Sequence, residues 1–80
     1  MRLRVLAFAR VAEVLGWSAR EIDVDTATPA RLFSQLCEQA PALTALAEST
    51  RFARNGRVVQ GNEPLSEGDE LTLLPPVGGG

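Results

Sequence analysis

Alternating apolar and polar residues predict a strand at each end of the chain. Residues 2–9 alternate, and so do residues 70–74. In the first stretch one face is apolar throughout, whereas the other face begins polar and becomes apolar at Leu6 and Phe8. In the last stretch, Leu74 lies on the face that Leu6 and Phe8 would share if the two strands were neighbours. A long crossover separates the two stretches, so they can pair in parallel.

Residues 28–40 carry the strongest helical signal. Thr28 is a residue type that caps helices, and Pro29 suits the first helical position because its missing N–H is not needed there. The helix is expected to run to about Gln39, since Pro41 cannot continue it. Its apolar residues form one stripe, made of Leu32, Phe33, Leu36, Cys37 and Ala40.

Shorter elements fill the rest of the sequence. Residues 21–25 alternate cleanly and predict a strand with one solvated face. Asn55-Gly56 is a strong two-residue hairpin signal between the short strands 52–54 and 57–59. Short helical or looping connections are expected over residues 10–16, ending at Gly16, and over residues 42–48.

This order of elements predicts an α+β fold. We expect a mixed sheet of four to five strands with one main helix packed across one face, a β-grasp (ubiquitin-like) arrangement. The helix stripe would meet the sheet residues Leu3, Val5, Ala7, Leu71 and Leu73. Leu6, Phe8 and Leu74 would then lie on the helix-free face, where exposed apolar side chains indicate a partner surface. The alternative, that loops cover these side chains, is equally compatible with the pattern.

Composition limits the chemistry of the chain. All eight basic residues are Arg, so no Lys or His can form a Schiff base or act as a general base. Without His or a second Cys, the usual zinc sites and nucleophile–base pairs are missing, and an autonomous enzyme is disfavoured. Cys37 is interpreted as a small buried apolar residue and Trp17 as a loop aromatic over the end of the core.

Charge and cysteine content limit the partners and the compartment. A net charge of −2 is too small to indicate a nucleic-acid or membrane surface, and no stretch has transmembrane length. A single cysteine excludes an internal disulfide and favours a reducing, cytoplasmic location. The group Arg51, Arg54 and Arg57 is interpreted as a solvated strand edge, with guidance of an acidic partner as the alternative.

Residues 75–80 read Pro75-Pro76-Val77-Gly78-Gly79-Gly80 and are expected to be a flexible tail after a domain of residues 1–74. Two prolines cannot continue a strand and favour an extended exit. Glycines have no Cβ and can enter a channel too narrow for other residues. A glycine run alone is also typical of a linker remnant, but the stiff Pro-Pro lead favours a functional tail. Acyl chemistry at the Gly80 carboxylate would require activation, most simply adenylation with ATP.

Residues in four places resemble the small subunit of molybdopterin synthase. They are the opening Val5-Leu6-Ala7-Phe8-Ala9-Arg10-Val11-Ala12-Glu13-Val14-Leu15-Gly16, Asn55, the motif Leu65-x-x-Gly68-Asp69-Glu70, and the ending Pro75-Pro76-Val77-x-Gly79-Gly80. The resemblance spans the whole chain, and its ending is the most specific part. Gly-Gly alone also fits thiamin-pathway sulfur carriers and ubiquitin-like modifiers.

The resemblance implies a β-grasp sulfur carrier that binds no cofactor or metal itself. A ubiquitin-activating-like adenylyltransferase would use ATP to adenylate Gly80, and a sulfur donor would convert it to a thiocarboxylate. The tail, residues 75–80, would insert into the large synthase subunit of a heterotetramer. That subunit would hold the catalytic residues and transfer sulfur to cyclic pyranopterin monophosphate, forming the dithiolene of molybdopterin.

The resemblance also implies a docking surface. Phe8, Val58 and Leu74 match apolar positions used against the large subunit, and strand phasing adds Leu6 to the same face. Leu74 stands where the family is expected to have an aromatic residue. Three other functions stay open: a sulfur carrier for cysteine or thiamin synthesis, a ubiquitin-like modifier conjugated through Gly80, and a plain interaction domain.

Overall fold

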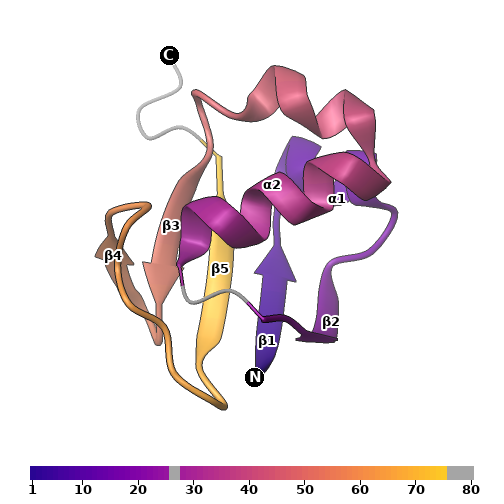
Figure 1. The fold of residues 1–80 in the computed structure, drawn as a ribbon. Coiled ribbons are helices and arrows are strands. Elements are labelled where there is room, and N and C mark those ends of the chain that lie inside the picture. Colours follow the sequence, from indigo (N-terminus) through magenta and orange to yellow (C-terminus); the bar gives the residue numbers. More distant parts are fainter. Residues whose placement is uncertain (26–27, 76–80) are drawn as a thin grey trace.

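The computed structural model describes residues 1–25 and 28–75, which form a five-stranded mixed sheet with helices on one face (Figure 1). The strand order is β2-β1-β5-β3-β4, so the first and last strands lie in the middle of the sheet. The strands are β1 Arg2–Ala7, β2 Ala19–Asp23, β3 Arg51–Arg54, β4 Arg57–Val59 and β5 Glu70–Leu74. This arrangement confirms the predicted α+β, β-grasp topology.

The central pair β1–β5 is parallel, as predicted, and it sets the two faces of the sheet. Val5 pairs with Leu71 and Ala7 pairs with Leu73 on the helix-covered face, whereas Leu6 pairs with Thr72 on the other face. β1 is shorter than expected and ends at Ala7. Ala9 has a φ of 52°, a left-handed conformation that a strand cannot contain, so the chain turns there into the next helix.

Three helical segments cover one face of the sheet, namely α1 Ala9–Leu15, α2 Pro29–Gln39 and η1 Pro41–Leu46. The predicted cap of α2 is confirmed, because the Thr28 hydroxyl oxygen accepts a hydrogen bond from the Arg31 N–H at 3.3 Å. Gly16 ends α1 with a φ of 85°, as predicted. The segment expected over residues 42–48 is a 3₁₀-helix that begins one residue earlier, at Pro41.

β2 begins and ends two residues before the predicted strand 21–25, although the predicted facing is right. Pairing with β1 extends back to Ala19, opposite Leu6, and this long-range pairing is invisible in the local pattern. Val24 still exchanges two backbone hydrogen bonds with Met1. Asp25 accepts a hydrogen bond from the Gln35 side chain as the chain turns towards α2.

The core lies between the sheet and α2. The predicted sheet residues and helix stripe meet there, and the fully buried leucines are Leu3, Leu32, Leu43, Leu71 and Leu73. Phe33 of α2 packs edge-on against Phe52 of β3, with ring centroids 6.1 Å apart. Cys37 and Trp17 are half-buried and pack against this cluster, which fits their sequence interpretation.

The β3–β4 hairpin has the predicted two-residue turn. Asn55 and Gly56 have φ values of 50° and 86°, which is the primed turn that matches strand twist. Within residues 1–25 and 28–75 no helix is long and apolar enough to cross a membrane.

Candidate functional site

The face of the sheet opposite α2 carries a row of apolar and small side chains. In register across four strands, Leu6 faces Thr72, Thr72 faces Ala53, and Ala53 faces Val58. Phe8 follows Ala7, which pairs with Leu73, so Phe8 lies level with the end of β5. We call Leu6, Phe8, Val58 and Leu74 the helix-free patch; strand alternation places all four on this face.

Two members of the helix-free patch, Phe8 and Val58, have exposed side chains. Phe8 is 49% exposed and Val58 is 63% exposed. Leu6 and Leu74 are half-buried between neighbouring strands. The alternative of covering loops is therefore wrong for Phe8, whereas contact with a partner stays a prediction for the whole patch.

Charged pairs occupy the other end of the same face. Arg2 of β1 contacts Asp23 of β2 at 3.1 Å, and Arg4 contacts Glu70 of β5 at 3.7 Å. The hydrogen bond from Arg2 and its positive charge hold the pKa of Asp23 below its usual value. These side chains are largely exposed, so water and salt screen each pair and it contributes little to stability. The face therefore carries ion pairs where β5 begins and, apart from Arg51 opposite Leu74, apolar side chains where β5 ends.

The tail leaves the sheet at the apolar end. β5 ends at Leu74, which lies opposite Arg51 of β3, and the next residue, Pro75, is exposed. The remaining predicted tail residues, Pro76, Val77, Gly78, Gly79 and Gly80, lie outside the described residues. The geometry thus brings the point of exit next to the patch without describing the tail itself.

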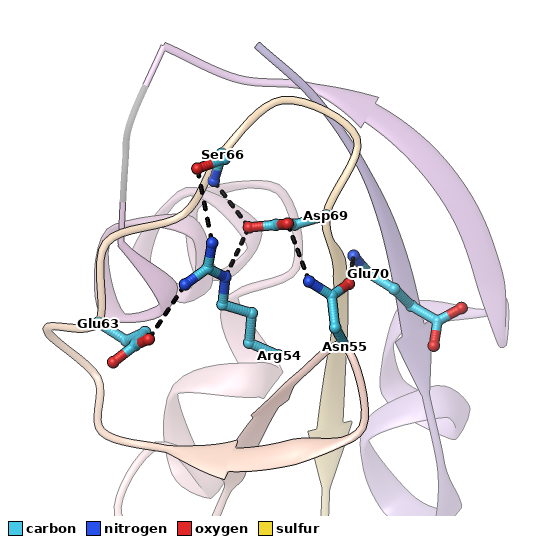
Figure 2. Close-up of polar contacts among 6 residues, drawn as sticks. All are labelled: Arg54, Asn55, Glu63, Ser66, Asp69 and Glu70. Carbon is cyan, nitrogen blue, oxygen red and sulfur yellow. Dashed lines mark hydrogen bonds and ion pairs between the residues drawn. The ribbon is translucent and has the colours of Figure 1, made fainter.

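A polar cluster at the other end of β5 has no counterpart in the sequence prediction (Figure 2). Asp69 accepts three hydrogen bonds: from Arg54 Nε at 2.7 Å, from the Ser66 N–H at 2.7 Å and from Asn55 Nδ2 at 3.0 Å. Arg54 also contacts Glu63 at 3.2 Å. Asp69 is only 8% exposed, so most of its contacts are with protein rather than water.

The cluster joins the β3–β4 hairpin to the start of β5. The Asn55 side-chain oxygen accepts from the Glu70 N–H at 2.9 Å, and the Asn55 N–H donates to the Glu70 carbonyl at 2.8 Å. Burial on its own raises the pKa of Asp69, but hydrogen bonds from Asn55, Ser66 and Arg54 outweigh it and leave the pKa below its usual value. The cluster therefore holds an ionised carboxylate at neutral pH.

The interpretation of Arg54 as part of a solvated strand edge is wrong. Its guanidinium is bound by Asp69 and Glu63 instead, and these carboxylates raise its pKa. Arg51 and Arg57 are exposed, as that interpretation expects. The motif around Asp69 was visible in the sequence, but its partner lies 15 residues earlier, and no local pattern reports that distance.

Across the described ranges, no group of His, Cys, Asp or Glu residues is arranged to hold a metal ion. The described residues thus form an apolar face beside the end of β5, with the polar cluster at the start of the same strand.

Comparison with known proteins agrees with this geometry. A profile described as the ThiS family matches residues 5–80. The "Molybdopterin synthase sulfur carrier subunit" of Chlamydomonas reinhardtii is 35% identical over 83 residues, covering 100% of both chains.

Solved structures show the same fold. SAMP1 from Haloferax volcanii matches with a TM-score of 0.82 and 32% identity, covering 100% of both chains. A chain from the complex of subunits 1 and 2 of the Helicobacter pylori molybdopterin-converting factor matches with a TM-score of 0.69 and 26% identity, also over 100% of both chains. These likenesses confirm the β-grasp fold and the resemblance drawn from the sequence.

Proposed function

The chain belongs to the ThiS family, and from that premise we propose that it is a sulfur carrier, the small subunit of a molybdopterin synthase. The observation that carries this proposal is the full-length match to a sulfur carrier subunit. The exposed helix-free patch beside the exit of the tail supports it. The family accounts for the tail chemistry, and the fold provides a surface by which an acceptor protein would recognise the chain.

The proposed chemistry takes place at Gly80. Its carboxylate oxygen attacks the α-phosphorus of ATP on an activating enzyme, and pyrophosphate leaves. A sulfur nucleophile from a donor then attacks the carbonyl carbon of the acyl-adenylate, and AMP leaves with its electron pair. If the donor is a persulfide, a second thiol reduces the resulting acyl disulfide, releasing the donor as a thiol and leaving a thiocarboxylate. The thiocarboxylate sulfur then bonds to cyclic pyranopterin monophosphate, and water hydrolyses the acyl–sulfur bond so that the carboxylate returns. A second thiocarboxylated chain supplies the other sulfur of the dithiolene.

The partner surface has to offset the cost of ordering the tail. Fixing a residue costs about 1–2 kcal/mol of backbone entropy, so residues 75–80 cost roughly 6–12 kcal/mol. Burying the exposed halves of Phe8 and Val58 would return about 1–2 kcal/mol each, since complete burial of such a side chain is worth about 1.5–3 kcal/mol. The patch alone does not balance the tail, so the acceptor must also bind the tail directly.

The proposed partners follow from this division of labour. A large synthase subunit would bind the helix-free patch and hold the catalytic residues; the Helicobacter pylori relative was solved as a complex of subunits 1 and 2. A ubiquitin-activating-like adenylyltransferase and a sulfur donor would act before it. We place these steps in the cytoplasm. The final transfer would take place in a heterotetramer of two small and two large subunits.

A second candidate function is protein modification through Gly80. It is favoured by the likeness to SAMP1 of Haloferax volcanii, a protein named small archaeal modifier protein 1. Such a modifier would form an amide with lysines of other proteins, but the absence of Lys here excludes side-chain-linked chains of itself. Sulfur delivery for cysteine or thiamin synthesis would use the same tail chemistry with another acceptor.

The test is the intact mass of the protein after incubation with activating enzyme, ATP and a sulfur donor. Replacement of one oxygen by sulfur, located at Gly80 by fragmentation, supports the carrier function. Addition of large subunit and cyclic pyranopterin monophosphate should then return the terminus to a carboxylate and yield molybdopterin. An unmodified terminus with a competent activating enzyme present would refute the carrier function, and conjugates to protein lysines would favour the modifier.

A further inference from the structure

The outer edge of β2 presents unpaired backbone groups. β2 lies at the edge of the sheet, at the far side from β4 (Figure 1). Met1 and Val24 exchange two hydrogen bonds, and the Ala7 N–H donates to the Ser18 carbonyl. In an antiparallel ladder, bonded pairs alternate, so the bonded partners on β2 are the even-numbered residues. The N–H and C=O groups of Ala19, Glu21 and Asp23 therefore point away from β1.

A hollow of about 280 Å³ lies beside this edge, between β2 and α2. Besides residues 20–23 of β2, it is lined by Trp17, Leu32, Leu36, Gln35 and Gln39, with the two leucines at its floor. The Gln35 amide at its rim donates a hydrogen bond to the Asp25 carboxylate at 3.2 Å. Leu32 and Leu36 are buried, whereas Trp17 and Ile22 are half-buried. A strand that paired with the edge would direct every second side chain towards this hollow.

Arg20 is the charged side chain that β2 directs to the side of the hollow. Arg20 lies on the same face of β2 as Ile22, with its guanidinium carbon 5.0 Å from the centroid of the Trp17 ring. Within the described part of the chain Arg20 forms no ion pair with a carboxylate. The neighbouring carboxylates of β2, Glu21 and Asp23, lie on the opposite face and contact Arg2. The hollow thus combines an apolar floor with the positive charge of Arg20, while the Asp25 carboxylate lies next to Gln35.

We propose that this edge and hollow bind an extended segment of another protein, which adds to β2 as a further strand. One apolar side chain of that segment enters the hollow opposite Ile22, and an acidic side chain two residues away pairs with Arg20. Main-chain hydrogen bonds to Ala19, Glu21 and Asp23 supply affinity, and the two alternate side chains supply specificity. We call this the β2 groove.

A second copy of this chain is a poor occupant of the β2 groove. Two-fold pairing of β2 with itself centred on Arg20 or on Glu21 places identical charges directly opposite each other. Centring on Ile22 places Glu21 opposite Asp23 twice. Like charges directly opposite on a sheet are destabilising, so these registers are disfavoured. Centring on Ala19 avoids like charges, but it pairs no other residue of β2 with β2. The pattern therefore favours a segment with complementary charge over a second copy.

The β2 groove is separate from the surface used in the proposed function. The groove lies on the α2 side of the sheet at the β2 edge, whereas the helix-free patch lies on the other face. An acceptor could therefore hold the patch and tail while a second protein holds the groove. The proposal is independent of sulfur transfer, because its test uses neither the chemistry of the tail nor ATP.

The test is an NMR titration of the ¹⁵N-labelled full chain with two capped synthetic peptides. One, Ser-Thr-Ile-Thr-Asp-Thr-Ser, has the order for antiparallel addition, and its reverse, Ser-Thr-Asp-Thr-Ile-Thr-Ser, has the order for parallel addition. We expect one of them to cause saturable shifts of the Ala19, Glu21 and Asp23 amides and of the Trp17 indole. Replacing Asp by Lys in that peptide should weaken binding about two- to fivefold.

Two variants decide whether Arg20 reads the peptide charge. Arg20→Glu should reverse the preference, so that the Lys peptide binds more tightly than the Asp peptide. Arg57→Glu, at the exposed opposite edge strand, is the matched control and should leave both affinities unchanged. Dispersed amide spectra of both variants establish that they fold.

Several results would overturn the proposal. They are an absence of saturable shifts up to the peptide solubility limit, shifts confined to β4 or the helix-free patch, and equal affinity for the Asp and Lys peptides. Concentration-dependent dimerisation in sedimentation equilibrium, with the β2 amides shifted, would assign the edge to a second copy instead.

Discussion

Replacing Asp69 with Asn should destabilise the domain far more than its small change in shape suggests. Both carboxylate oxygens of Asp69 face donors: Oδ2 accepts from Arg54 and Ser66, and Oδ1 accepts from Asn55. An amide has only one oxygen, so in either orientation its NH₂ group meets a donor. The variant therefore loses at least one hydrogen bond to a charged group and leaves Arg54 with a weaker partner.

The expected loss is about 2–4 kcal/mol. A hydrogen bond to a charged group contributes about 1.5–3 kcal/mol, and an unsatisfied buried donor costs about 1–3 kcal/mol. Water reaches part of the cluster, since the Arg54 side chain is 28% exposed, so the two contributions do not add fully. For a domain of this size 1 kcal/mol corresponds to about 4–8 °C, so the melting temperature should fall by roughly 10–30 °C.

Urea unfolding followed by circular dichroism measures this loss, and Asp23→Asn is the matched control. Asp23 also pairs with an arginine, at 3.1 Å, but its side chain is 71% exposed, so its removal should change stability far less than Asp69→Asn does. Equal losses for the two variants, or a loss below about 1 kcal/mol for Asp69→Asn, would refute the argument that burial makes the difference.

The same carboxylate predicts a pH dependence of stability. Because the folded protein holds the pKa of Asp69 below the unfolded value, its contribution is complete above the unfolded pKa and is lost as pH falls through the folded pKa. Wild-type stability should therefore decline in acid below about pH 4, the usual Asp value. Asp69→Asn should show a shallower decline, and an unchanged acid slope would contradict the assignment.

Three further outcomes are expected. Phe8→Asp should weaken binding to a large synthase subunit about tenfold or more in calorimetric titration, by replacing half-exposed apolar area with a charge, while the dichroism spectrum stays unchanged; unchanged affinity or loss of the fold would contradict the docking role. Removing Gly80 should abolish thiocarboxylate formation in the mass assay with little change in melting temperature, and a truncated chain that still carries sulfur would refute the tail chemistry. Gly56→Val should cost about 1–3 kcal/mol in urea unfolding, because its φ is 86°; the space around it is open, so a neutral result would show that the turn readily relaxes.

Much of the fold could be predicted because its signals are local. Alternation in residues 2–7 and 70–74, the Thr28 cap and the Asn55-Gly56 turn each act through neighbours in sequence. The bounds of β2 could not be predicted from the same signals, because Ala19 is a strand residue only through its pairing with Leu6. Local pattern therefore predicted which elements exist, whereas long-range pairing decided where this one begins.

The candidate site was predictable to a different extent at each residue. Alternation placed Phe8 on the helix-free face, whereas Val58, in a strand of three residues, was identified only through the family resemblance. Arg54 was misinterpreted because its alternation matches an edge strand, and only the folded chain brings Asp69 and Glu63 to it. Ion pairs of this kind depend on loop closure, which the sequence pattern does not report.

The central position of β5 has a consequence for how the domain folds. On one side of β5 lie β1 and β2, which are joined through α1, and on the other lies the β3–β4 hairpin. The two halves share no strand pairing until β5 inserts between them, and its pairing with β1 closes a loop of more than sixty residues. Contacts of such sequence separation slow folding, and we expect the pairing of β5 to limit the rate, so Leu71→Ala should slow refolding in stopped-flow measurements. The strand that presents the tail is thus the one whose arrival completes the sheet, and a chain that has not finished folding cannot present its patch and its tail together.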